Sequence, residues 1–319
     1  MVGMACQLNL DTGAGADLRK IASAQSARLC DLLADARESI SGHHKTRRCL
    51  KRLRSLLMLA QPVLGHRNWR RLDRRLAGLG RALSHERDHA VVLDVLAKLA
   101  AEDADRTICM AAATLMRKLQ PAAKERPNGH DPWPDGSAVD REPLLRTAEW
   151  IGRRIAKTPF ERLDLAQMAQ GVAAEYRAGR KALAAAYRIG GAESFHDLRK
   201  RVQRHVRQLQ LIAAIWPEEM HVRIALAKTI AGQLGHDHDL ALVRSAIDAG
   251  LTGSDAATLD RLYRDRQRAI RKAIKPQLAR LYAETPKAFA RRMAAYSDAS
   301  SPAGSRQPVS AATAARGLS

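Results

Sequence analysis

Two copies of a basic segment carry the residues that could do chemistry in this chain. The first basic segment starts at His44 and reads HKTRRCLKRLR; the second starts at His196 and reads HDLRKRVQRHVR. An acidic motif follows each copy, LSHERDHAVVL with Asp88 and LGHDHDLALVR with Asp239. The separation is 44 positions from His44 to Asp88 and 43 positions from His196 to Asp239. A repeated internal spacing predicts a duplicated structural module, and its cations predict that the module binds an anion.

The residue types in these segments suit phosphate groups in particular. Arginine presents a planar fork that makes paired hydrogen bonds to phosphate oxygens, and lysine adds a mobile point charge. A neutral histidine donates one hydrogen bond and adds charge once it is protonated. We expect His44 and His196 to lie near helix N-termini, where free amides favour an anion.

Helical periodicity gives each segment a cationic face and an apolar face. On a wheel that advances about 100° per residue, the cations of the first segment fall within about 80° of His44. The leucines of that segment fall on the opposite side, and the second segment repeats the arrangement around His196. His205 falls on the apolar side, so we interpret it as a core histidine and not as a ligand.

Composition limits the class of protein. The 319 residues carry a formal net charge of +21, which favours nucleic acid, an anionic membrane surface or a smaller polyanion as partner. Aromatic residues make up only 4%, which weakens the case for a single-strand binder that stacks bases. Four cysteines without a CxxC pair indicate reduced thiols in a cytoplasmic protein. The sequence shows no 18-residue apolar run and no signal-peptide pattern, so we expect no membrane span.

The chain reads as all-α, with two helical bundles joined by a linker. We expect the first bundle over 17–124 and the second over 144–293. Residues 125–143 are dense in Pro, Gly and Asp, as in a linker. We expect disorder over 1–16 and 299–319, which lack helical periodicity.

The acids of the two motifs allow two interpretations. Asp88 and Asp239 could each orient an arginine or histidine of the basic face, as carboxylates do around metal ligands. Each could equally form an ordinary ion pair along its own helix, and the sequence does not separate the two.

These residues resemble the conserved histidine α-helical domain, the CHAD family. The resemblance rests on both basic segments and both acidic motifs, on EYRAGRKALAAAY before Phe195, and on LYAETPKAFARRM over 281–293. It covers roughly residues 17–293. It implies two helical bundles related by a pseudo-twofold axis, with a basic cavity between them. It also implies non-catalytic binding of inorganic polyphosphate and association with polyphosphate granules.

The motif positions imply a set of polyphosphate ligands. Gln203 departs from the family pattern where lysine is expected, and Asp73 and Gly78 depart from it in the first repeat. The expected ligands are His44, Arg47, Arg48, Lys51, Arg52, Arg54, Arg74, Arg75, Arg81, Tyr176, Arg177, Arg180, His196, Arg199, Lys200, Arg204, Arg207 and Lys228. No cofactor and no metal is expected.

Three alternatives remain at this point. Nonspecific nucleic-acid binding fits the net charge, although no base-reading side chains accompany the basic faces. A metal-dependent phosphohydrolase could use the run His236-Asp237-His238-Asp239, but the first copy has no matching run. Membrane-surface binding would need large apolar anchors, and the apolar faces are expected in bundle cores. The oligomeric state is left open.

Overall fold

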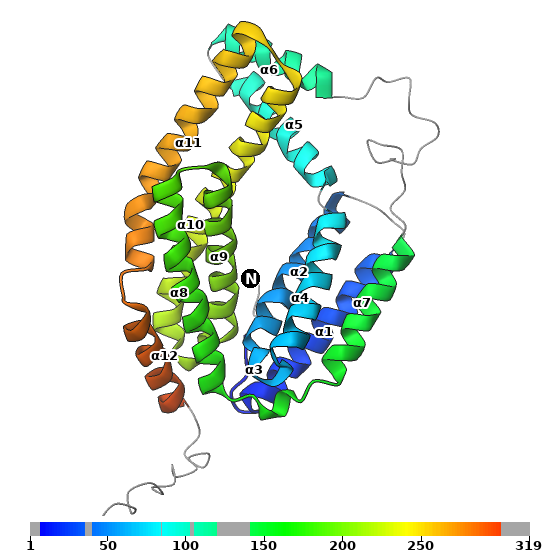
Figure 1. Cartoon of the computed structure of the whole chain (residues 1–319), viewed down its shortest axis with the longest axis vertical. Helices are drawn as coiled ribbons and strands as arrows, with labels where there is room; N and C mark the ends of the chain where they lie inside the picture. The colour runs from blue at the N-terminus through cyan, green and yellow to red at the C-terminus, as the bar shows by residue number, and fades with distance from the viewer. Residues whose placement is uncertain (1–6, 36–39, 84, 103–104, 120–140, 301–319) are drawn as a thin grey trace, which may run out of the picture.

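The computed structural model describes residues 7–35, 40–83, 85–102, 105–119 and 141–300, without the side chains of 40–44, 85–88 and 102. Every regular element in these ranges is a helix (Figure 1). The expected all-α class is therefore confirmed for the described part of the chain. The expected linker lies almost wholly outside the described residues, as do 1–6 and 301–319.

The α-helices follow one another along the chain with short connections, except between α6 and α7, where residues 120–140 lie outside the described part. A 3-10 turn at Phe160–Arg162 precedes α8, and another at Ala213–Ile215 precedes α10. The α-helices are α1 (Ala14–Ala34), α2 (Ile40–Leu59), α3 (Gln61–Leu64), α4 (His66–Ala82), α5 (His85–Glu102), α6 (Arg106–Leu119), α7 (Arg141–Ala156), α8 (Leu165–Ile189), α9 (Ala192–Leu211), α10 (Pro217–Gly250), α11 (Gly253–Leu281) and α12 (Pro286–Ser300).

The ends of the expected disordered tails belong to the fold. Leu8 is buried, and its backbone N–H donates to the Leu211 carbonyl. Helix α1 begins at Ala14 and α12 ends at Ser300, whose hydroxyl donates to the Ile215 carbonyl. Residues 7–16 and 299–300 therefore belong to the described fold, although periodicity predicts disorder there, because they pack on helices distant in sequence.

Packing does not follow the two sequence halves. The larger core joins α1–α4 with α7–α9, α12, the N-terminal part of α10 and the C-terminal part of α11. The smaller core joins α5 and α6 to α10 and α11. Helix α10 has 34 residues and is about 51 Å long, so it contributes to both cores. Helix α7 packs on α1, although the predicted boundary assigns it to the second bundle (Figure 1).

Local signals explain how α8 and α9 form a hairpin. Asp164 caps α8 by accepting from the Gln167 backbone N–H, while the Gln167 side chain accepts from the Asp164 N–H. Gly190 ends α8 with a φ of 75°, a left-handed conformation that suits glycine. Helix α9 then starts at Ala192 and runs back along α8, which carries the second basic segment beside α2.

Candidate anion-binding site

The two basic segments form helices that pack against each other. The first segment lies in α2 and the second in α9, and the two helices are in contact. Lys51 of α2 is close enough to lower the pKa of His196 on α9, and Arg52 of α2 lowers that of Arg207 on α9. Helices far apart in sequence thus place their cations in one electrostatic environment.

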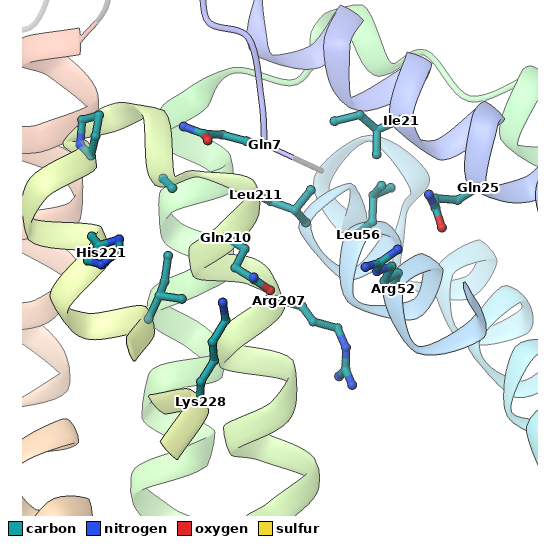
Figure 2. Close-up of a pocket in the computed structure, with 13 residues that line it drawn as sticks. Gln7, Ile21, Gln25, Arg52, Leu56, Arg207, Gln210, Leu211, His221 and Lys228 are labelled. Carbon is teal, nitrogen blue, oxygen red and sulfur yellow. The ribbon is translucent and has the colours of Figure 1, made fainter. Parts of the chain in front are cut away.

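A cavity of about 360 Å³ lies where these helices meet α1 and the start of α10 (Figure 2). Arg52, Arg207 and Lys228 reach it from α2, α9 and α10, and His221 lines it from α10. Among the described residues that line the cavity, none is acidic. The others are Gln7, Ile21, Gln25, Leu56, Gln210, Leu211, Ala213, Pro217 and Ile224. Unneutralised cations and amide groups around one cavity favour an anionic ligand.

Arg207 is a partly buried cation with other cations close to it. Burial and the neighbouring Arg204, Arg52 and Arg199 lower its pKa to about 10. It remains protonated at neutral pH, and its guanidinium donates to the Gln203 carbonyl one turn earlier, 3.0 Å away. The fold therefore holds like charges together, and an anion would relieve their repulsion.

His196 is a neutral group in this environment. Its ring stacks on His238 of α10 with centroids 4.4 Å apart, and its Nδ1 has no hydrogen-bond partner among the described atoms. Burial, with Lys200 and Arg199 as further contributors, lowers the pKa of His196 to about 4. His196 is the fifth residue of α9, so it lies beyond the free amides of the first turn. Its contribution to an anion would be a hydrogen bond without a charge.

Three other expected ligands of these helices differ in exposure. Arg48 and Lys200 are exposed, and Lys200 forms a surface ion pair with Asp197 at 3.1 Å. Arg199 is buried, with 8% of its surface exposed. Exposed Arg48 and Lys200 can reach a ligand, whereas Arg199 acts mainly through its charge.

Arg47 and Arg54 face α4 and not the cavity. Arg47 donates to the Leu83 carbonyl at 3.0 Å, just beyond the C-terminus of α4. Arg54 makes a bidentate ion pair with Asp73 of α4, at 2.7 and 3.0 Å. Both arginines therefore join α2 to α4, a structural role that their place on the basic face did not indicate.

Arg204 is paired with a buried carboxylate that the sequence reading did not single out. Glu175 of α8 has no exposed surface and lies 3.2 Å from Arg204 and 3.3 Å from Arg201. Burial raises the pKa of Glu175, and the two arginines oppose that rise. Its position in EYRAGR, beside the expected ligands Tyr176 and Arg177, was the signal available in the sequence.

The expected ligands of α8 lie on different faces of that helix. Tyr176 is fully buried, stacks on Phe289 at 4.0 Å and donates its hydroxyl to the Glu284 carbonyl. Arg180 donates to the same carbonyl, while Arg177 is exposed. Tyr176 therefore belongs to the aromatic core around His205 and is closed off from a ligand.

The expected ligands of α4 also lie apart from the cavity. The Arg75 guanidinium is 4.3 Å from the centroid of the Trp150 ring on α7. Arg74 and Arg81 are exposed. No α4 residue lines the cavity between α2, α9 and α10.

The acidic motifs are described in part. The side chains of His44 and Asp88 lie outside the described residues. Asp237 makes a bidentate ion pair with Arg271 of α11, so one acid of the second motif joins α10 to α11. Asp239 is half-buried on α10. Within the described residues no group of three or more His, Cys, Asp or Glu could hold a metal ion.

A profile described as the CHAD domain matches residues 20–248. No curated protein and no solved structure gives a significant match. No helix among the described residues is long and apolar enough to cross a membrane.

Proposed function

Because the chain belongs to the CHAD domain family, we propose that it binds inorganic polyphosphate, without catalysis, at the surface shared by α2, α9 and α10. The observation that carries the proposal is the cavity lined by Arg52, Arg207 and Lys228, with no acid among its described lining residues. Lys51, Lys200 and Arg48 extend the cationic surface along α2 and α9. Association with polyphosphate granules in the cytoplasm would follow from the same affinity.

The chemistry of the cavity fits a polyanion that carries no bases. A polyphosphate chain offers only charge and phosphate oxygens, so arginine forks, lysine ammonium groups and amide N–H donors suffice to bind it. Among the described residues that line the cavity, the His221 imidazole is the only aromatic ring, which leaves little for base stacking. Binding should weaken as salt rises, by the counterion release known from nucleic acids.

Binding of long-chain polyphosphate and of duplex DNA with matched phosphate content tests the proposal. The variant Arg52→Glu with Lys228→Glu reverses two charges of the cavity, and neither residue has a hydrogen bond or ion pair within the described structure that the change would break. We expect polyphosphate to bind the wild type more tightly than DNA and to lose at least about tenfold in affinity in the variant, or about 1.4 kcal/mol.

A matched control is Arg261→Glu with Lys272→Glu, two exposed residues of α11 on the opposite side of the molecule from α2 (Figure 1). This pair makes the same change in net charge. Equal losses in both variants, or equal affinity for DNA and polyphosphate, would mean that only the diffuse charge of the protein matters, and the proposal would fail.

A further inference from the structure

A second cationic surface lies outside the cavity, on α4 and α7. Five arginines of α4 have no hydrogen bond and no ion pair with any described residue. Four of them are exposed, and the fifth, Arg75, is partly exposed beside Trp150 of α7. We call this the α4–α7 surface; its α4 arginines are Arg67, Arg70, Arg71, Arg74 and Arg75.

Acids of the neighbouring helices do not neutralise this surface. Asp73 is the only acid of α4, and it forms an ion pair with Arg54 of α2. On α7, Glu142 pairs with Arg146 at 2.6 Å and Glu149 lies 3.8 Å from Arg153, both along α7 itself. The five arginines of the α4–α7 surface therefore have no acidic partner among the described residues.

Trp150 holds two of these arginines in place. The guanidinium carbons of Arg75 and Arg71 lie 4.3 and 4.9 Å from its ring centroid. A guanidinium stacked on an indole loses side-chain freedom but keeps its N–H edge for paired hydrogen bonds to phosphate. Two such groups from adjacent turns of one helix form a prearranged phosphate-binding surface.

The surface can bind phosphate but is poorly suited to reading bases. The Arg71 and Arg75 guanidiniums lie over the Trp150 ring, where they compete with a base that would stack on it. Asn68 is the only Asn or Gln of α4, and its amide donates to the Leu64 carbonyl and accepts from Arg154. No base-reading amide is therefore left on α4.

We propose that the α4–α7 surface binds a second stretch of the same polyphosphate chain, so that one long chain occupies the cavity and this surface together. The inference rests on the proposed function. Helix α4 packs directly on α2 through the Arg54–Asp73 pair, so the two surfaces are on adjacent helices. The arginines from Arg67 to Arg74 extend over about 10 Å of helix. A polyphosphate chain that fills the cavity must therefore be longer than the cavity alone requires if it is also to bind this surface.

Linked sites give a clear dependence on chain length. A short chain such as tripolyphosphate occupies the cavity alone, whereas a long chain engages both surfaces and gains from effective concentration. We expect long chains to bind the wild type on the order of 10²-fold more tightly than tripolyphosphate, after correction for the number of binding positions per chain.

The variant Arg67→Glu with Arg71→Glu tests the inference, beside the Arg261→Glu, Lys272→Glu control. We expect the α4 variant to bind tripolyphosphate within about twofold of wild type and to lose most of the gain for long chains. The control should keep that gain. The neutral variant Arg67→Gln with Arg71→Gln should lose part of the affinity gain for long chains. It replaces the charge-reversal variant in the test if that variant does not fold.

Other results would overturn the inference. Equal losses for tripolyphosphate and long chains, or no loss for either, would mean that α4 contributes only to the general field. Loss of duplex DNA binding with an unchanged long-chain gain would assign the surface to nucleic acid. If tripolyphosphate and long chains both fail to bind the wild type, the proposed function itself fails and the inference fails with it.

Discussion

Neutralising the buried carboxylate of Glu175 should tighten polyphosphate binding. Glu175 forms an ion pair with Arg204 at a distance of 3.2 Å. Arg204 lies on α9, the helix that also carries Arg207 and His196. The substitution Glu175→Gln keeps the shape of the side chain and removes its charge. Because burial raises the pKa of Glu175, the fold already disfavours the charged form, and we expect the variant to remain folded.

The size of the effect follows from distances. A phosphate bound at the outer edge of the Arg204 guanidinium would lie about 8 Å from the Glu175 carboxylate, given normal hydrogen-bond lengths on both sides. Repulsion over that distance is about 2 kcal/mol at an effective dielectric constant of about 20. Screening at 0.15 M salt leaves roughly 0.8 kcal/mol, or about fourfold in affinity.

Calorimetric titration with tripolyphosphate at neutral pH measures this change. Asp265→Asn, which removes one charge from a surface ion pair on α11, is the matched control and should change affinity little. The advantage of the Gln variant should shrink as pH falls, because the wild-type carboxyl then becomes protonated as well. Unchanged or weaker binding by a folded Glu175→Gln variant would refute the idea that Glu175 competes with the ligand for Arg204.

Two predictions concern stability. Burial lowers the pKa of His205 from 6.5 to about 3, so the unfolded chain takes up a proton that the fold excludes, and stability falls as pH drops below 6.5. From pH 7 to pH 5 this costs about 2 kcal/mol; His205→Leu should lose that much less in urea unfolding, and an equal pH dependence in both proteins would contradict the prediction. A methyl group at Gly179 would overlap the buried Tyr282 ring, so Gly179→Ala should destabilise by about 1–3 kcal/mol. A methyl group at Gly232 has no neighbouring atoms, so Gly232→Ala should stabilise the protein by up to about 1 kcal/mol. Melting curves that rank the two glycine variants in the opposite order would contradict the close contact between Gly179 and Tyr282.

Helical periodicity predicted the parts of the fold that depend on one helix at a time. The predicted apolar faces are buried, as Leu53 of α2 and Leu198 of α9 illustrate. His205 is fully buried, which confirms its interpretation as a core residue. His44 and His196 are each the fifth residue of their helix, in keeping with the repeated spacing.

Helical periodicity could not predict which helices pack together or which charged residues pair. A helical wheel gives the direction of a side chain but not the neighbour that it contacts. Arg54 and Arg204 lie on the cationic faces of their helices, yet each pairs with an acid of another helix. Arg54 pairs with Asp73, 19 positions away, and Arg204 pairs with Glu175, 29 positions away. The two cores likewise depend on the length of α10, which no local pattern assigns to one bundle or the other.

The most direct test of the account is the stoichiometry of tripolyphosphate binding in a calorimeter, for wild type, Arg52→Gln of α2 and Arg207→Gln of α9. If α2 and α9 build one site, the wild type binds one tripolyphosphate tightly, and each substitution weakens that same event. If two tight events occur and each substitution removes one of them, the two repeats bind independently, and the claim of a shared site is contradicted.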